Sequence, residues 1–212
     1  MSLVIVVRPK FDTATAFLFE WTRKLVPTYI DKYPETFKEF KEDASDDRTV
    51  QDFVDSAPKE GSLLYIHYDH GVYDKLFGAG KTVVFDESTI NKLSGYIVYA
   101  FACESAKQLG VKAIQDGVKA YLGYKEIFGF VLSKSNYFGY IAVRPAIMLI
   151  EGKTTGEVYK EIKKELKSLV YTFYAEYKKT GSYDVYMAAV WAYKDYKGWT
   201  LLGNYNERFI LE

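Results

Sequence analysis

Cysteine and histidine are scarce in this sequence, which has one cysteine and two histidines in 212 residues. A single cysteine excludes an internal disulfide, and this predicts a protein of a reducing compartment such as the cytoplasm. It also argues against a zinc-type site, because no further Cys or His is present to complete the ligand set. His67 and His70 are three residues apart, so on a strand their side chains point to opposite faces. We therefore expect no metal and no cofactor.

The sequence also lacks an excess of either charge and has no long apolar run. Lys plus Arg and Asp plus Glu balance at 28 each, so bulk charge does not indicate a nucleic acid or an acidic membrane as partner. No apolar stretch reaches the roughly 18 residues of a membrane span. The apolar start, Leu3–Val7, is too short for a signal-peptide core. We expect neither a nucleic acid nor a membrane as partner.

Glutamine and asparagine are few, whereas aromatic residues make up 17% of the chain, with 20 tyrosines. An amide-poor sequence whose cations are mostly lysine is typical of thermophilic proteins. The composition of 49% apolar and 26% charged residues provides enough apolar material for a sizeable core. No repeat or low-complexity linker divides the chain, and the sequence predicts a single domain over 1–212.

Short apolar runs alternate with segments of helical period through the first two thirds of the chain. Continuous runs of β-branched and aromatic residues are typical of buried strands, and they fall at Leu3–Val7, Leu63–Tyr68, Tyr96–Ala102 and Val118–Tyr124. Helical spacing is expected around 15–26 and 33–40, and in a helix that starts at about 103–105 and ends at Gly117. This alternation predicts a three-layer αβα sandwich with a mostly parallel central sheet.

The last third of the chain has mostly helical period. Helices are expected over 140–150, 155–179 and 184–196, and 198–205 is expected to form a final strand or hairpin. The sequence thus predicts a core of about 1–135 with a helical C-terminal addition over 136–212. A neutral surface rich in tyrosine is compatible with a homodimer.

One glycine-rich stretch, Gly78-Ala79-Gly80-Lys81-Thr82, superficially resembles a phosphate-binding loop. It lacks the first glycine of that motif, because position 75 is lysine, and it precedes an expected strand where the motif precedes a helix. The stretch is better interpreted as part of an edge hairpin.

Chemistry-bearing residues follow two of the expected strands. His70 comes directly after the run 63–69, and Cys103 directly after the run 96–102. If these runs are neighbouring parallel strands, both residues lie at the carboxyl edge of the sheet, where open α/β sheets have their active sites. The spacing therefore predicts that the cysteine and one histidine meet.

The two residues fit the requirements of a cysteine nucleophile. A helix beginning near Cys103 would lower the pKa of its thiol, and His70 is the natural base. Gly71 allows a sharp turn of the backbone, so the N–H groups of Gly71 and Cys103 are the expected oxyanion donors. Asp69, Asp74 and Asp86 are each possible orienters of His70. The plainer interpretation also stands, because a lone cysteine is often just a small buried apolar residue.

The stretches His70-Gly71 and Ala102-Cys103-Glu104-Ser105, each after an apolar strand, resemble the caspase-like cysteine peptidases. With the later run Gly117-Val118-Lys119-Ala120, the segment 60–135 looks most like the CHAT and gingipain-type domains of that clan. The resemblance implies a His70 and Cys103 dyad, Gly71 as oxyanion donor, and a peptide or protein substrate. Phe101 stands where caspases have Gln, and Glu104-Ser105 replaces their following pair, so the chain departs from true caspases.

Three functions remain open from the sequence. The first is a cysteine endopeptidase with the His70 and Cys103 dyad. The second is a catalytically silent caspase-like module for binding or assembly, for which we expect a buried Cys103 with a normal or raised pKa. The third is a doubly wound domain that binds a small ligand, for which we expect His70 and Cys103 to lie well apart.

Overall fold

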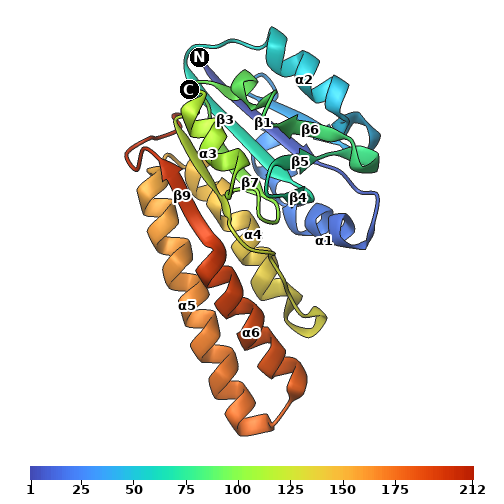
Figure 1. Ribbon diagram of the computed structural model, residues 1–212, viewed down its shortest axis with the longest axis vertical. Helices are drawn as coiled ribbons and strands as arrows, with labels where there is room; N and C mark the ends of the chain where they lie inside the picture. The colour runs from blue at the N-terminus through green and yellow to red at the C-terminus, as the bar shows by residue number, and fades with distance from the viewer.

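The computed structural model describes residues 1–212 and is built around one six-stranded sheet (Figure 1). The strand order is β2-β1-β3-β7-β8-β9. The first five strands run parallel, and β9 is antiparallel to β8. The strands are β1 (Ser2–Arg8), β2 (Phe37–Lys41), β3 (Ser62–Tyr68), β7 (Ile97–Phe101), β8 (Ala120–Tyr124) and β9 (Trp199–Gly203).

Each face of the sheet is covered by its own apolar core. One core holds α1 (Thr13–Thr22), α4 (Ser135–Ile150) and α5 (Thr155–Thr180) against the sheet. The other holds α2 (Asp47–Ser56), α3 (Leu109–Gln115) and a small antiparallel sheet of β4 (Gly71–Val72), β5 (Lys75–Phe77) and β6 (Val83–Asp86). The predicted α/β architecture with a mostly parallel sheet between helices is confirmed.

The strand period of two explains why both faces are apolar. Along β3, Leu64, Ile66 and Tyr68 enter one core, whereas Leu63 and Tyr65 enter the other. The strand pairs in parallel with β7, with Tyr68 opposite Phe101. Because the register aligns the last residues of the two strands, the chain leaves β3 and β7 at the same edge of the sheet.

The C-terminal segment is helical, as predicted, and ends in a strand that rejoins the sheet. Helices α5 and α6 (Tyr183–Gly198) form a long hairpin that projects beyond the sheet (Figure 1). The turn between them begins at Gly181, whose φ of 65° closes α5 in the left-handed conformation. A satellite core of Phe138, Phe173 and the alanines of α6 joins α4, α5 and α6. No helix combines the length and apolar character needed to cross a bilayer.

Two predicted helices are wrong in their bounds or type. The stretch 33–40 is not helical but leads into β2, because Phe37 pairs with Val4 of β1 and extends the sheet. The helix expected from about 103–105 begins only at Leu109. The turn 103–108 is held instead by long-range backbone hydrogen bonds, in which Ala106 N–H donates to Tyr124 O at 3.1 Å and Leu109 N–H to Tyr73 O at 2.9 Å.

Candidate active site

The structure brings His70 and Cys103 to the same edge of the sheet. His70 follows the end of β3 by two residues, and Cys103 follows the end of β7 by two residues. Both line one cavity of about 70 Å³, together with Asp69, Phe101 and Ala102 from the same strand ends. Residues of α1 and of the segment after β8 complete its wall: Ala14, Leu18, Trp21, Phe128 and Phe130. A space of this size holds a few waters or a small chemical group.

Gly71 is the point at which the two strand-end loops touch. A Cβ at this position would lie 2.8 Å from the Cβ of Ala102 and 2.9 Å from the carbonyl oxygen of Cys103. A larger residue would therefore push the His70 loop away from the Cys103 loop. The sequence predicted a special role for this glycine through its turn, whereas the structure gives it a close approach of two backbones. The role of its N–H as an oxyanion donor stays a prediction.

The ring of His70 is held by Asp12, which the sequence analysis did not identify. His70 Nε2 lies 2.7 Å from Asp12 Oδ2, and both side chains are about one third exposed, at 35% and 34%. The other carboxylate oxygen, Oδ1, accepts the Thr15 N–H at 2.9 Å and so caps α1. Asp12 is thus both the N-cap of α1 and the partner of the His70 ring.

The environment keeps Asp12 ionised. Its partial burial acts to raise the pKa, but hydrogen bonds from Thr15 and His70 outweigh burial and hold the pKa of Asp12 below its ordinary value. A signal for this residue was present in the sequence, because Asp12 follows the first strand and precedes Thr15 at capping distance. The parallel order of β1 and β3 places that strand end beside His70.

The three predicted orienters lie in different places. Asp69 lines the cavity, and its Oδ1 accepts the backbone N–H of His70 at 2.6 Å. Asp74 lies 3.6 Å from Lys75 Nζ. Asp86 accepts the N–H groups of Ser88 and Thr89 and so shapes the turn after β6. The structure therefore joins Asp69 alone of the three to the site, through the backbone of His70 and not through its ring.

Asp69 is a buried carboxyl group with one unsatisfied oxygen. The residue is 3% exposed, and its Oδ2 has no hydrogen-bond partner. Burial raises the pKa of Asp69 to about 8, against the opposing effect of the His70 N–H. At neutral pH this carboxyl group is therefore largely neutral, in contrast to Asp12.

Burial also dominates the thiol of Cys103. It raises the pKa of Cys103, negative charge on Asp195 and Glu104 acts in the same direction, and the backbone N–H groups of Phe128 and of Cys103 itself act to lower it. The predicted helix N-terminus is not at Cys103, because α3 begins six residues later, so the expected lowering of the thiol pKa by a helix dipole is wrong. Glu104, the next residue, has a φ of 56°. A left-handed conformation in a non-glycine residue stores strain of a kind that often marks functional turns.

The segment 127–131 forms the aromatic wall of the cavity. Phe128 and Phe130 line the cavity, and Gly129 between them donates its N–H to Asp195 Oδ1 at 3.1 Å. The ring of Phe130 lies 4.9 Å from Trp21 and 5.2 Å from Phe17, measured between centroids, so this wall is packed against α1. The alternation of phenylalanines about a glycine was visible in the sequence, but its place beside Cys103 was not.

His67 lies away from this chemistry. Its side chain is fully buried, its Nδ1 lies 3.0 Å from the hydroxyl of Tyr65, and burial lowers the pKa of His67 to about 3. The imidazole is therefore neutral and belongs to the core. No group of three or more His, Cys, Asp and Glu side chains has an arrangement that could hold a metal ion.

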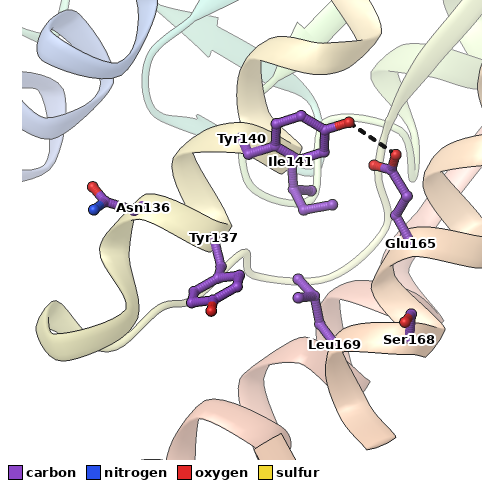
Figure 2. A pocket seen from close by; sticks show the side chains of 7 residues that line it. All are labelled: Asn136, Tyr137, Tyr140, Ile141, Glu165, Ser168 and Leu169. Carbon is purple, nitrogen blue, oxygen red and sulfur yellow. Dashed lines mark hydrogen bonds between the residues drawn. The ribbon is translucent and has the colours of Figure 1, made fainter. Parts of the chain in front are cut away.

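A larger and more open groove lies between α4 and α5, with a volume of about 390 Å³ (Figure 2). Tyr137 and Tyr140 of α4 face Glu165 and Leu169 of α5 across it, and Tyr140 donates its hydroxyl to Glu165 Oε1 at 3.1 Å. Burial raises the pKa of Glu165. Neither His70 nor Cys103 lines this groove, so size alone does not locate the chemistry.

Neither the models of known protein families nor the curated proteins match this chain. The assignment of a function therefore rests on the residues of the cavity and their geometry.

Proposed function

We propose that this protein is a cysteine endopeptidase in which His70 and Cys103 form the catalytic dyad. The observation that carries the proposal is the shared cavity, which both residues line at the carboxyl ends of the neighbouring parallel strands β3 and β7. The strained turn at Glu104 and the ionised Asp12 on the histidine ring support it further. The resemblance of the two strand-end motifs to caspase-like peptidases points to the same chemistry.

The proposed reaction proceeds through a thioester. The sulfur of Cys103 attacks the peptide carbonyl, the new C–S bond forms, and the thiol proton passes to His70. His70 then gives that proton to the leaving amine as the C–N bond breaks. Water hydrolyses the thioester and restores the thiol, while the N–H groups of Gly71 and Cys103 stabilise the oxyanion of each step.

Asp12 determines which nitrogen of His70 takes part. With Nε2 donating its proton to the carboxylate of Asp12, the lone pair is on Nδ1, and this nitrogen transfers the proton. The negative charge of Asp12 stabilises the imidazolium that forms. Asp12 is thus a positioning residue that does not itself touch the substrate.

The raised pKa of Cys103 gives the resting enzyme a neutral thiol. The proton must therefore leave during the attack, which makes the base indispensable. No backbone hydrogen bond pairs the adjoining residues 127–131 with a strand of the sheet. Asp195 engages the Gly129 N–H, so a peptide substrate that lies alongside as an added strand would pair with the other main-chain groups of this segment.

The test is hydrolysis of a peptide library by the wild type and by Cys103→Ala and His70→Ala. We expect each variant to lose at least about a hundredfold in kcat/KM, the lower end for loss of a positioned acid or base. Lys92→Ala, which removes an ion pair with Asp55 that does not line the cavity, is the control and should keep full activity. A wild-type rate in either dyad variant contradicts the proposal.

A catalytically silent binding module is the second candidate, and two observations favour it. The thiol pKa is raised and not lowered, and the cavity is narrow. The pH dependence of iodoacetamide alkylation separates the two functions. In a peptidase, His70→Ala slows alkylation of Cys103 because the base is gone. In a silent module, the thiol reacts only at high pH and is indifferent to His70. For a small-ligand-binding domain we expect His70 and Cys103 to lie well apart, and the cavity that both residues line argues against that alternative.

A further inference from the structure

Helix α6 holds Gly129 through two of its side chains. The first is Asp195, whose Oδ1 accepts the Gly129 N–H at 3.1 Å. The second is Trp191, whose indole ring lies so close that a Cβ on Gly129 would overlap it. Residues 191 and 195 are four apart in a helix and therefore lie on the same side of it. One face of α6 thus fixes a single glycine.

The surroundings of Asp195 favour a lasting hydrogen bond to its side chain and disfavour a negative charge on it. The residue is fully buried, its Oδ2 has no partner, and no lysine or arginine lies in salt-bridge contact with it. Burial raises the pKa of Asp195 well above its ordinary value, which favours the protonated form of the side chain. A neutral carboxyl group has the same shape as an asparagine amide, with one oxygen that accepts.

Gly129 lies at the centre of the wall 127–131, between the two phenylalanines that line the cavity. Its neighbours Phe128 and Phe130 both line the cavity that Cys103 lines, and Phe130 packs against Trp21 of α1. A shift of Gly129 therefore moves both phenylalanines of the aromatic wall beside Cys103. The hydrogen bond to Asp195 is the one hydrogen bond that the Gly129 N–H makes.

We propose that Asp195 and Trp191 are positioning residues that hold the cavity wall 127–131 against Cys103 from the C-terminal hairpin. Asp195 acts through its acceptor oxygen and Trp191 through ring contact with Gly129. The catalytic consequence of this proposal rests on the proposed peptidase function. Its structural part concerns only the reactivity of the Cys103 thiol.

The experiment compares Asp195→Ala with Asp195→Asn in the full-length protein. The measurements are amide hydrogen exchange at Gly129, the pH profile of Cys103 alkylation by iodoacetamide, and peptide hydrolysis. For Asp195→Ala we expect Gly129 exchange to rise at least fivefold, and alkylation at neutral pH to rise at least fivefold because a loosened wall exposes the partly buried thiol, while kcat/KM falls at least fivefold. For Asp195→Asn we expect all three to remain within about twofold of the wild type, because the acceptor oxygen is retained.

Two results overturn the proposal. If Asp195→Ala leaves Gly129 exchange and the alkylation profile unchanged, the wall is not held by this residue. If Asp195→Asn is as impaired as Asp195→Ala, the acceptor role is wrong. Should Asp195→Ala fail to fold, Trp191→Leu provides the second variant, with the same expected rise in alkylation. Exchange and alkylation need no peptidase activity, so absence of hydrolysis in the wild type would count against the proposed function alone.

Discussion

Aspartates beside the rim of the cavity and beside its inner wall have pKa values that are shifted in opposite directions. At the rim, Asp12 is one third exposed, carries hydrogen bonds from Thr15 and His70, and has a lowered pKa. At the wall, Asp69 and Asp195 are buried, each has one unpartnered oxygen, and the pKa of each is raised. Among three aspartates around this site, the pKa of Asp12 is thus lowered, whereas the pKa values of Asp69 and Asp195 are raised.

Hydration and hydrogen-bond donors, and not residue type, therefore determine whether an aspartate of this site favours its charged form. A carboxylate that keeps water and donors stays charged and can orient an imidazole. A carboxyl group without them remains protonated and serves as a fixed hydrogen-bonding partner in the wall. Pairs of acids whose environments separate their pKa values are characteristic of active sites.

The largest effect should come from Asp69→Asn, which removes an ionisable group from the wall. The folded-state pKa of about 8 lies above the unfolded value of about 3.9. The unfolded chain therefore ionises first, and the wild type loses stability from about pH 4 to about pH 8. Asn keeps the acceptor for the His70 N–H but cannot ionise, so we expect a gain of at most about 4 kcal/mol at pH 7.

Urea unfolding at several pH values measures this difference. The gain of the Asn variant should be close to zero at pH 4, increase through neutral pH and level off above about pH 8. Parallel curves for variant and wild type over this range would show that Asp69 ionises freely in the folded protein, and would remove it from the neutral wall.

Gly129→Ala should have the next largest effect, because the added Cβ overlaps the ring of Trp191. Overpacking of this kind costs about 1–3 kcal/mol in the free energy of unfolding. The matched control is the same substitution in a Trp191→Ala background, where the ring is absent and the cost should largely disappear. An equal cost in both backgrounds would mean that the ring and the glycine are not coupled.

Asp12→Ala tests the rim, with a smaller effect on stability. Loss of the α1 cap should cost about 0.5–2 kcal/mol. Asp46→Ala is the matched control, because Asp46 caps α2 by accepting the Thr49 N–H at 2.8 Å and does not line the cavity. Both variants should lose similar stability, measured by urea unfolding.

Peptide hydrolysis should distinguish the cap Asp12 from the cap Asp46. The bond of Asp12 to His70 is a hydrogen bond to a charged group, worth about 1.5–3 kcal/mol, so Asp12→Ala should lower kcat roughly ten- to hundredfold while Asp46→Ala leaves it unchanged. If both caps reduce kcat equally, the role of Asp12 is confined to the helix.

The smallest effect concerns the acid limb of stability. Because the folded-state pKa of Asp12 is lowered, its contribution to stability is present above the unfolded pKa and is lost as pH falls through the folded value. Asp12→Asn should therefore show a shallower loss of stability below about pH 4 than the wild type. Identical acid limbs would mean that Asp12 gains nothing from its partners at the rim.

The sheet edge that carries His70 and Cys103 was largely predictable from the sequence, because the ends of strands are encoded locally. The runs 63–68 and 96–102 predicted strands, and parallel pairing of the two places His70 and Cys103 at one edge. The helix after Cys103 was misplaced because the turn 103–108 is determined by distant carbonyls, those of Tyr73 and Tyr124. Helical spacing in 106–114 indicated the helix but carried no information about those acceptors.

The apolar strands and the helical C-terminal segment follow from local composition and period, and the sequence also provides the one cysteine and the histidine on which the proposed chemistry depends. Tertiary structure decided which acid holds His70, how buried Cys103 is and which helix holds Gly129. Asp12, His70, Cys103 and Asp195 come from four separate parts of the chain. Their ionisation depends on water and neighbours that only the folded sheet brings together, and no local pattern records those neighbours.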